Sequence, residues 1–353
     1  MNIDRYIEEL KTLVNIDCGT RTPEGVAAVA NIMQSLWQRE GWHTEQIDLG
    51  DKVGPAVFVC NKPQATQFDV LLVGHLDTVF PAGTVAERPM SRDDSRLYGP
   101  GVADMKSGLL NILWAMRTLD AADRERLSIA VAMNPDEETG SVYSHEWIGE
   151  LAQRAGCVLV CEAARADGSL VNARKGMAGY HLAFHGVAAH AGNDPDKGRS
   201  AITALAHSIL AVNALADREK GTTLNPGIIS GGSAANVVAD SATLELDVRF
   251  RENDEYIRVD TALQALCEKG LPEGVTATLT CVTYKPAMAA SEATHNLMRK
   301  VEMAGQEEGI PITWQAVGGG SDANHTAALG IPTLDGFGPI GAGFHSPAEW
   351  LDT

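Results

Sequence analysis

The chain has 353 residues, a length that fits two domains, and its formal net charge is −18. A chain this acidic repels phosphate backbones, so we expect no nucleic-acid partner. Hydrophobic residues make up 44 % of the chain, which is typical of a globular protein, and no stretch approaches the ~20 consecutive apolar residues of a membrane span.

The N-terminal segment MNIDRYIEELKTLV carries acidic residues where a signal peptide carries basic ones, and it contains no apolar core segment. The 6 cysteines form no Cys-x-x-Cys pair, so reduced thiols fit the chain better than a disulfide framework. Both observations predict a cytoplasmic protein without a membrane partner.

The N-terminal half alternates helix-like and strand-like patterns. Apolar residues recur at helical spacing over 2–16, and Thr22 followed by Pro23 predicts the N-cap and first turn of a second helix. Further helices are expected at 105–119 and 143–154. Short runs rich in valine and leucine indicate strands buried on both faces, at 55–60, 69–75, 127–133 and 157–162. The alternation predicts an α/β fold with a mainly parallel sheet flanked by helices.

The pattern changes near Lys175. A strand of alternating polarity, GMAGYHLAFHGV, is followed by a helix, two strands, a second helix and a further strand, which together predict a self-contained α+β unit. After Pro286 the alternation of helix and strand returns. We therefore expect an inserted domain at 176–285 and a discontinuous first domain at 1–175 plus 286–353.

Histidine and acidic residues follow several of the predicted strands. His75 and Asp77 stand two residues apart at the end of DVLLVGH, so His75 can bind a metal ion while Asp77 accepts the other ring N–H. Asp104 follows a Gly-Pro-Gly turn, where a carboxylate can bridge two cations. Each feature has a simpler alternative, since the first can be a polar strand end and the second a helix N-cap.

Three consecutive acids, Asp136, Glu137 and Glu138, follow the next strand, and their charges repel one another unless a cation is present. Adjacent side chains point in different directions, so one glutamate can bind a metal while its neighbour reaches a metal-bound water. Glu162 ends a fully apolar strand and is either a ligand or the partner of a base such as Arg165.

A glycine-rich loop near the C-terminus carries a further histidine and completes a set of five potential ligands. The set is His75, Asp104, Glu138, Glu162 and His345. Most of its members stand at the carboxyl ends of strands, where open α/β sheets bind ligands. Two histidines and three carboxylates suit a pair of borderline cations, so we predict two Zn²⁺ ions per chain, with Co²⁺ or Mn²⁺ as substitutes.

The motifs HLDT, GPGVADMKSG, DEETGS, CEAAR and GFHSPAE, in this order and spacing, resemble the co-catalytic dizinc metallopeptidase family. That family includes glutamate carboxypeptidases, acetylornithine deacetylases and succinyl-diaminopimelate desuccinylases. The resemblance implies that Asp104 bridges two zinc ions. It places His75 and Glu162 in one zinc site, and it places Glu138 and His345 in the other.

The same resemblance implies roles beyond the metal ligands. Glu137 is expected to be the general acid and base on a bridging water, and Asp77 the residue that orients His75. A cis peptide bond is expected after Asp104. The inserted domain, with its GxxAHAG signature, is expected to be a lid that also forms a homodimer, with His190 acting in the partner subunit's active site.

Four residues at positions that match family motifs are expected to contact substrate: Asn236, Arg249, Lys285 and Gly319. Glutamate carboxypeptidases tend to carry Arg-Pro where this chain has Lys285-Pro286, and lysine holds a carboxylate as a point charge rather than as a bidentate fork. Two alternatives stay open. Arg249 can pair with Asp247 or Glu245 on its own strand, and Lys285 can be solvated.

The resemblance implies a zinc-dependent hydrolase that cleaves an amide or peptide bond next to a free carboxylate, most similar to a glutamate carboxypeptidase. Glu137 would deprotonate the water and then protonate the leaving amine. The expected substrate is a small N-acyl amino acid or peptide. An N-acyl-amino-acid deacylase is the alternative, followed by a non-catalytic binding protein on the same fold and by a nucleotide-dependent enzyme suggested by GPGVAD.

Overall fold

The computed structural model describes residues 2–353, which divide into two compact units. The first comprises residues 2–174 and 290–353, and the second is Lys175–Ala289. The sequence predicts 176–285 for the inserted domain, and the observed unit is slightly longer at both ends. Each unit has its own cluster of buried hydrophobic side chains. Among the described residues, no helix combines the length and apolarity that crossing a lipid bilayer requires.

A six-stranded sheet forms the centre of the first unit, in the order β1-β2-β6-β3-β7-β16. Its strands are β1 (His43–Ile47), β2 (Ala56–Cys60), β3 (Val70–His75), β6 (Ile129–Asn134), β7 (Val158–Val160) and β16 (Thr333–Leu334). Neighbouring strands from β6 to β16 pair in parallel. Strand β2 pairs antiparallel with both β1 and β6. The largely parallel sheet confirms the predicted fold class. The sequence does not predict β1, because HTEQI has no apolar run and lies at the sheet edge.

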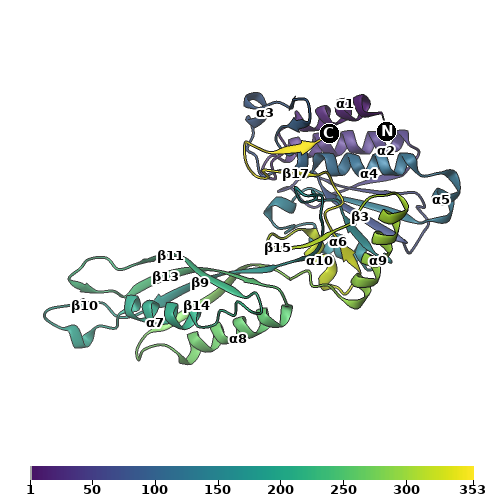
Figure 1. The fold of residues 1–353 in the computed structure, drawn as a ribbon. Coiled ribbons are helices and arrows are strands. Elements are labelled where there is room, and N and C mark those ends of the chain that lie inside the picture. Colours follow the sequence, from purple (N-terminus) through teal and green to yellow (C-terminus); the bar gives the residue numbers. More distant parts are fainter. Residues whose placement is uncertain (1) are drawn as a thin grey trace. The chain divides into compact units, whose positions relative to one another are not determined.

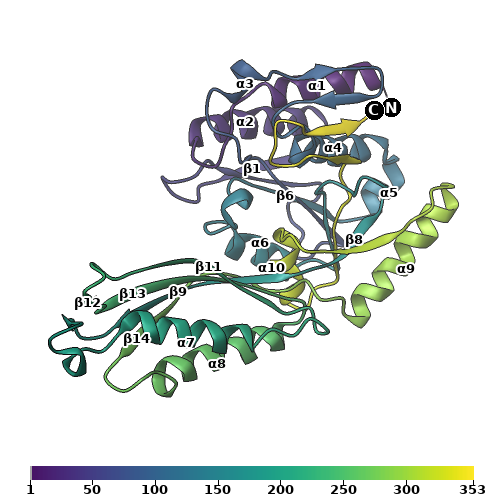
Figure 2. The same cartoon turned by 60° about the vertical axis from the view of Figure 1, so that its left-hand side comes forward.

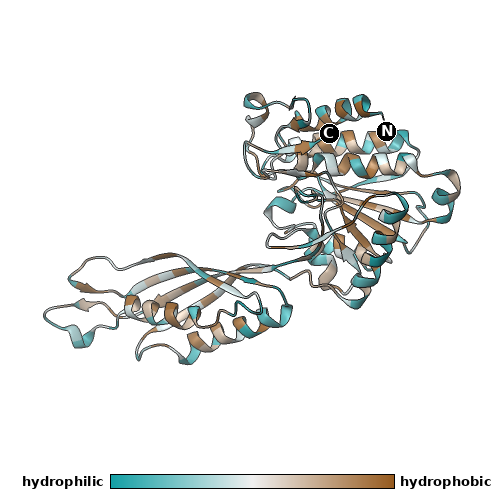
Figure 3. Cartoon of the chain, in the orientation of Figure 1, coloured by the Kyte–Doolittle hydropathy of each residue, from teal (hydrophilic) through white to brown (hydrophobic). Residues whose placement is uncertain are grey.

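Helices cover both faces of this sheet (Figures 1 and 2). On one side lie α1 (Ile3–Val14), α2 (Pro23–Arg39) and α4 (Ser107–Thr118), and on the other lie α6 (His145–Ala152), α9 (Glu292–Glu307) and α10 (Asp322–Ala328). Two short helices, α3 (Thr84–Glu87) and α5 (Ala121–Arg126), lie in the connections. Helix α2 begins at Pro23 as predicted, although the Thr22 hydroxyl makes no capping hydrogen bond. Hydrophobic residues gather in the buried strands (Figure 3).

The helix predicted at 105–119 begins later than the sequence suggests. Val102–Lys106 forms a separate irregular turn in which Asp104 has φ −115° and ψ 91°, outside the helical range, and α4 begins at Ser107. The peptide bond between Asp104 and Met105 is cis, as the family resemblance predicts. Apolar periodicity does not reveal this turn, because Val102, Ala103 and Met105 are all buried as they would be in a helix.

Two smaller sheets complete the first unit. Strands β8 (Leu170–Arg174) and β15 (Trp314–Val317) pair in parallel, and the other sheet has the order β17-β18-β5-β4. Its strands are β4 (Ser91–Arg92), β5 (Arg96–Tyr98), β17 (Gly341–Ala342) and β18 (Trp350–Asp352). Strands this short are determined by pairing between distant segments, so no local pattern predicts them. The connection between β17 and β18 carries His345.

The second unit is a four-stranded antiparallel sheet with two helices on one face (Figure 1). The strand order is β11-β13-β9-β14, and the helices are α7 (Ala201–Asn213) and α8 (Asn253–Lys269). The strands are β9 (Gly176–His185), β11 (Thr223–Gly231), β13 (Ser241–Phe250) and β14 (Thr276–Lys285), with a separate short pair of β10 (Ala189–His190) and β12 (Val237–Val238). Alternate side chains of β9 are buried, including Tyr180, Leu182 and Phe184, as the alternating sequence predicts.

The close approach of α4 to the strand end at β7 can be tested by substitution. A Cβ atom added at Gly108 would lie 2.2 Å from the carbonyl oxygen of Cys161, a backbone atom that cannot move aside as the end of a flexible side chain can. We expect Gly108→Ala to lower the free energy of unfolding by about 1–3 kcal/mol in urea denaturation, because α4 must shift away from the sheet. At Gly318 nothing lies within 4 Å of the added atom, so Gly318→Ala should stay within about 0.5 kcal/mol of wild type. Equal stabilities of the two variants would contradict this packing.

Candidate active site

The five predicted ligands all lie in the first unit, on five different segments. His75 ends β3, Asp104 lies in the turn before α4, and Glu162 follows β7. Glu138 lies in the short helical turn after β6, and His345 lies in the β17–β18 connection with a φ of 60°. A non-glycine residue in the left-handed region is energetically unfavourable, and such conformations cluster at functional sites.

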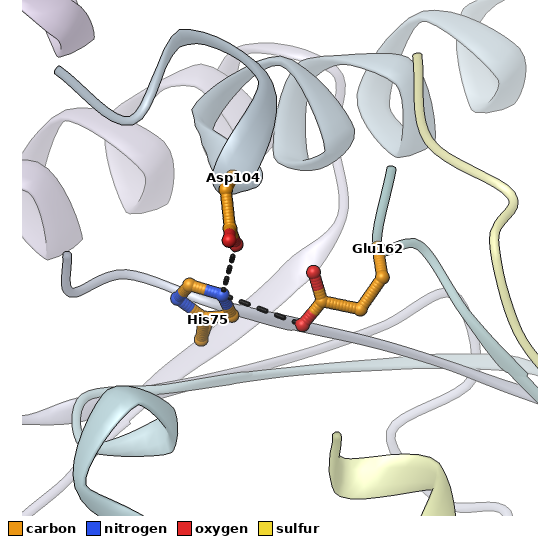
Figure 4. A group of neighbouring side chains, drawn as sticks. All are labelled: His75, Asp104 and Glu162. Atoms are coloured by element: carbon orange, nitrogen blue, oxygen red, sulfur yellow. Dashed lines mark hydrogen bonds and ion pairs between the residues drawn. The ribbon is translucent and has the colours of Figure 1, made fainter. Parts of the chain in front are cut away.

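The ligands form two groups that share Asp104. In the first, Nε2 of His75 lies 3.1 Å from Oδ1 of Asp104 and 3.4 Å from Oε1 of Glu162, and Figure 4 shows the three side chains pointing toward one another. In the second, Nε2 of His345 lies 3.2 Å from Oδ2 of Asp104 and 3.2 Å from Oε2 of Glu138. Asp104 therefore directs one carboxylate oxygen toward each group.

The spacing within each group fits a metal ion. The ligand atoms of each group lie within 4.8 Å of one another. An ion placed among them can reach every atom at the ~2.0–2.2 Å typical of zinc with nitrogen and oxygen ligands after small side-chain movements. Imidazole nitrogens and carboxylate oxygens are ligands that zinc accepts, so the residues present fit a two-zinc centre with Asp104 as the shared ligand.

The electrostatics of the cluster indicate a need for positive charge. Burial and the charge of Asp104 raise the pKa of Glu162 to about 8, and burial is also the main cause that raises the pKa of Glu138 to about 7. Hydrogen bonds with Asp104 and Glu138 raise the pKa of His345 to about 10. Without metal, protons on the histidines and glutamates offset the crowded carboxylates, and divalent cations can take their place.

Asp77 supports both the histidine and the acidic turn. It is fully buried, and Nδ1 of His75 lies 3.0 Å from its main-chain oxygen and 3.3 Å from its Oδ1, while Nε2 of His75 faces Asp104 and Glu162. Its carboxylate also accepts backbone N–H bonds from Glu137 at 3.2 Å and from Glu138 at 3.3 Å. A single carboxylate therefore links the orientation of His75 to the position of the turn that carries both glutamates.

The three consecutive acids differ in their surroundings. Asp136 is buried away from the ligand groups, and its carboxylate accepts hydrogen bonds from the Ser144 hydroxyl at 2.5 Å and the Tyr143 backbone N–H at 2.7 Å. Glu137 and Glu138 instead line the pocket. Asp136 thus holds the segment in place, and its two neighbours face the site.

Glu349 was not predicted as a site residue, although it belongs to the GFHSPAEW segment. It is 1 % exposed and accepts backbone N–H bonds from Gly101 at 3.0 Å, Ala103 at 2.8 Å and Asp104 at 3.0 Å. Burial raises the pKa of Glu349 to about 7. These bonds connect the chain segment that follows His345 to the turn that presents Asp104, which is a long-range contact that no local spacing reveals.

A pocket of about 270 Å³ opens beside the ligands. Its lining comprises Asp104, Glu137, Glu138, Glu162, Ala163, Arg165, Arg174, Gly319, Gly320, Phe344 and His345. Gly319, which the sequence predicts to contact substrate, is part of this lining, whereas the sequence did not mark Arg174 at all. Among the described ion pairs, Glu162 is paired with His75 and not with Arg165, so the alternative of a Glu162–Arg165 pair is wrong.

The predicted histidine of the second unit is oriented by its own loop. His190 is exposed, and its Nδ1 accepts backbone N–H bonds from Gly192 and Asn193, both at 3.1 Å. These bonds assign the ring proton of neutral His190 to Nε2, which can donate to an oxygen. Asn236 is also exposed, and its backbone oxygen accepts a bond from Ala191 at 3.0 Å, which holds the two segments together.

The two predicted carboxylate-binding residues of the second unit have different surroundings. Nε of Arg249 lies 2.9 Å from Oδ2 of Asp247, so the pairing left open by the sequence occurs in this structure. Lys285 is only 7 % exposed, so the alternative that it is solvated is wrong.

Comparison with known proteins gives consistent matches over most of the chain. The M20 peptidase dimerisation domain matches residues 172–275, and peptidase family M28 matches residues 56–196. Carboxypeptidase G2 from Pseudomonas sp. (strain RS-16) is 33 % identical over 355 residues, covering 98 % of this chain and 84 % of that protein. Acetylornithine deacetylase from Proteus mirabilis (strain HI4320) is 30 % identical over 243 residues, covering 65 % of this chain and 62 % of that protein.

The fold is also that of a solved structure. An M20 family metallo-carboxypeptidase, Sso-CP2 from Sulfolobus solfataricus, superposes with a TM-score of 0.70 at 18 % identity, covering 99 % of this chain and 95 % of the other.

In the metal-free protein, the free energy of unfolding should fall as the pH rises from 6 to 9. Glu138 and Glu162 have folded pKa values of about 7 and 8, above the ~4.3 of an unfolded glutamate, so they destabilise the metal-free fold increasingly across this range. His75 and His345 have raised pKa values, so they stabilise the metal-free fold fully below the ~6.5 of an unfolded histidine, and this stabilisation is lost as the pH rises. All four shifts therefore act in the same direction.

Thermal unfolding of chelated protein, with and without added Zn²⁺, measures this effect. We expect the increase in Tm on adding zinc to grow from pH 6 to pH 9, because the metal replaces protons that the cluster otherwise loses. A Tm that zinc does not change at any pH in this range would contradict a metal site in this pocket.

Proposed function

Because the chain belongs to the M20 family of metallopeptidases, we propose that it is a dizinc hydrolase of an amide or peptide bond next to a free carboxylate, similar to a glutamate carboxypeptidase. The observation that carries the proposal is the position of Asp104. Its two oxygens face two separate ligand groups, and Glu137 lines the same pocket. A small N-acyl amino acid or peptide is the proposed substrate.

Two Zn²⁺ ions would be held by the two ligand groups, with Asp104 in both. When bound, the ions polarise a carbonyl group and increase the acidity of water. The charges also balance, because the four carboxylates of Asp104, Glu137, Glu138 and Glu162 equal the charge of two divalent cations. Asp77 would keep His75 in position through its main-chain oxygen and its carboxylate, and Asp77 and Glu349 both accept hydrogen bonds from the backbone of the ligand-bearing turns.

Glu137 would move the proton in both halves of the reaction. It takes a proton from the attacking water and then donates it to the leaving amine, so one side chain serves as general base and general acid. The Asp77 carboxylate fixes the backbone N–H of Glu137 and thereby the start of its turn. His190, with its proton on Nε2, would donate a hydrogen bond to the substrate carbonyl oxygen in the active site of the other protomer of a homodimer.

The substrate carboxylate requires a cation, and the −18 net charge of the chain makes a local positive group necessary. Lys285 and Arg249 are the proposed groups from the second unit, with Asn236 as a further contact and Gly319 on the side of the pocket. Arg249 would exchange Asp247 for the substrate.

N-acyl-amino-acid deacylation is the second candidate function, and the similarity to acetylornithine deacetylase favours it. Both reactions break an amide bond beside a carboxylate. A hydrolysis panel that varies the acyl group and the amino acid independently separates them. Faster turnover when the amino acid is glutamate supports the carboxypeptidase, whereas dependence on a short acyl group supports the deacylase.

Glu137→Gln tests the general base. The amide keeps the size of the side chain but cannot accept the proton, so we expect kcat on the best substrate to fall by a factor on the order of 10²–10⁴. Zinc content, measured by atomic emission, should match that of wild type because Glu137 is not among the proposed ligands. Near-normal kcat with normal zinc content would show that Glu137 is not the base.

The second unit supports a homodimer through its match to the peptidase dimerisation domain and through its exposed apolar side chains. Strand β11 lies at a sheet edge, and its Ile228 and Ile229 are 59 % and 60 % exposed. Leu210 on the neighbouring α7 is 69 % exposed. An unpaired strand edge beside apolar side chains is a suitable surface for a second copy of this unit.

Subunit exchange tests both the dimer and the action of His190 across it. His190→Ala and Glu137→Gln proteins should each be nearly inactive, and their equimolar mixture should recover about a quarter of the wild-type rate. Random pairing makes half of the dimers mixed, and each mixed dimer has one intact site.

Two further variants serve as controls for the mixture. Leu210→Glu in both proteins should abolish the recovery, because it places a charge on the proposed interface. Ile257→Glu, on a residue of α8 that is 59 % exposed, should not. A mixture that regains nothing after confirmed exchange would exclude action of His190 between protomers.

A further inference from the structure

Arg165 lies in the pocket beside the metal ligands. It follows Glu162 by three residues and lines the pocket together with both ligand groups. Its guanidinium carbon lies 5.4 Å from the centre of the Phe344 ring, and Nη2 donates to the carbonyl oxygen of Ala163 at 2.6 Å. Phe344 immediately precedes His345, so contacts to segments that carry two ligands hold this cation in place.

The guanidinium of Arg165 has no acidic partner. None of the ion pairs among residues 2–353 includes it, and its buried Nε has no hydrogen-bond partner. The neighbouring Arg174 is different, because its Nε lies 2.7 Å from Oδ2 of Asp335 and its Nη1 donates to Gly319. A buried donor without an acceptor is costly, and a ligand that supplies an acceptor to the guanidinium would reduce that cost.

The charge of the loaded pocket points to the same class of ligand. Two divalent cations offset the four carboxylates of the site, and Asp335 offsets Arg174. The charge of Arg165 is not offset, so the pocket carries a net charge of +1. Burial and the charge of Arg174 lower the pKa of Arg165, and an anion at the guanidinium relieves both effects. A guanidinium fork binds a carboxylate through two parallel hydrogen bonds.

We infer that Arg165 binds the free carboxylate of the substrate's amino acid, inside the pocket that holds the metal ligands. The inference rests on the proposed function, since it names the residue that recognises the carboxylate beside the broken bond. Arg165 is then a specificity determinant of the first unit. It adds a cation of the first unit to the two that are proposed from the second, Lys285 and Arg249.

The test compares each N-acyl amino acid with its carboxamide, which lacks the negative charge. The measured quantity is the ratio of kcat/KM for the acid to that for the amide, in wild type, Arg165→Gln and Arg165→Lys. We expect Arg165→Gln to lower this ratio by about 10- to 100-fold, because a hydrogen-bonded charge pair is lost. Arg165→Lys should give an intermediate ratio, since lysine keeps the charge but not the fork.

Arg96→Gln is the matched control. Arg96 also lies over an aromatic ring of the first unit, 3.6 Å from the centre of Trp350, but it does not line the pocket. Its acid-to-amide ratio should equal that of wild type. Zinc content and Tm are measured for every variant, and if Arg165→Gln does not fold, the Arg165→Lys ratio alone decides the question.

Three outcomes overturn the inference in distinguishable ways. An unchanged ratio in both Arg165 variants, with wild type still preferring the acid, leaves the proposed function intact and assigns the carboxylate to another cation. If Arg165→Gln leaves the acid-to-amide ratio unchanged but lowers kcat/KM for an N-succinyl amino acid relative to its N-butyryl analogue, Arg165 contacts the acyl end of the substrate. A wild-type enzyme that hydrolyses neither acid nor amide contradicts the proposed function itself, and the inference fails with it.

Discussion

Four carboxyl groups, those of Asp104, Glu137, Glu138 and Glu162, share one pocket of about 270 Å³, and their mutual repulsion is the constraint on which the site depends. Burial and neighbouring charge raise the pKa of Glu138 and Glu162 toward neutrality, and the two histidines become more basic in response. Divalent cations remove this repulsion without consuming protons. The same crowding that destabilises the metal-free pocket therefore favours two metal ions, with Asp104 between them.

Hydrogen bonds to the backbone hold these mutually repelling groups together. Asp77 accepts N–H bonds from the turn that carries Glu137, and Glu349 accepts three from the turn that carries Asp104. Both carboxylates are buried, so their bonds are not exchanged with water. Because the ligands come from five separate segments, these contacts between distant parts of the chain maintain the geometry of the site.

The sequence predicted the five residues that the structure brings into two groups, because four of them lie at or just after recognisable elements and the carboxyl ends of parallel strands meet at one edge of a sheet. Helices α1 and α2 were predicted from local signals too, the helical spacing of apolar residues over 2–16 and the Thr22-Pro23 pair that marks the start of α2. Strand β1 is polar throughout, and β17 and β18 exist only through pairing with distant segments, so no local pattern indicates them. Arg165 lines the pocket and Glu349 contacts the Asp104 turn only because distant segments meet in the fold, so no local pattern indicates their positions. The catalytic and substrate-binding roles of the site residues stay predictions.

The central claim is that two metal ions lie on either side of the Asp104 carboxylate. Crystals of the zinc-loaded protein, measured above and below the zinc absorption edge, test it most directly because the anomalous difference map reports only the metal. The account predicts two peaks per chain, one bonded to His75, Asp104 and Glu162 and the other to Asp104, Glu138 and His345. A single peak, or two peaks of which only one contacts Asp104, would contradict it.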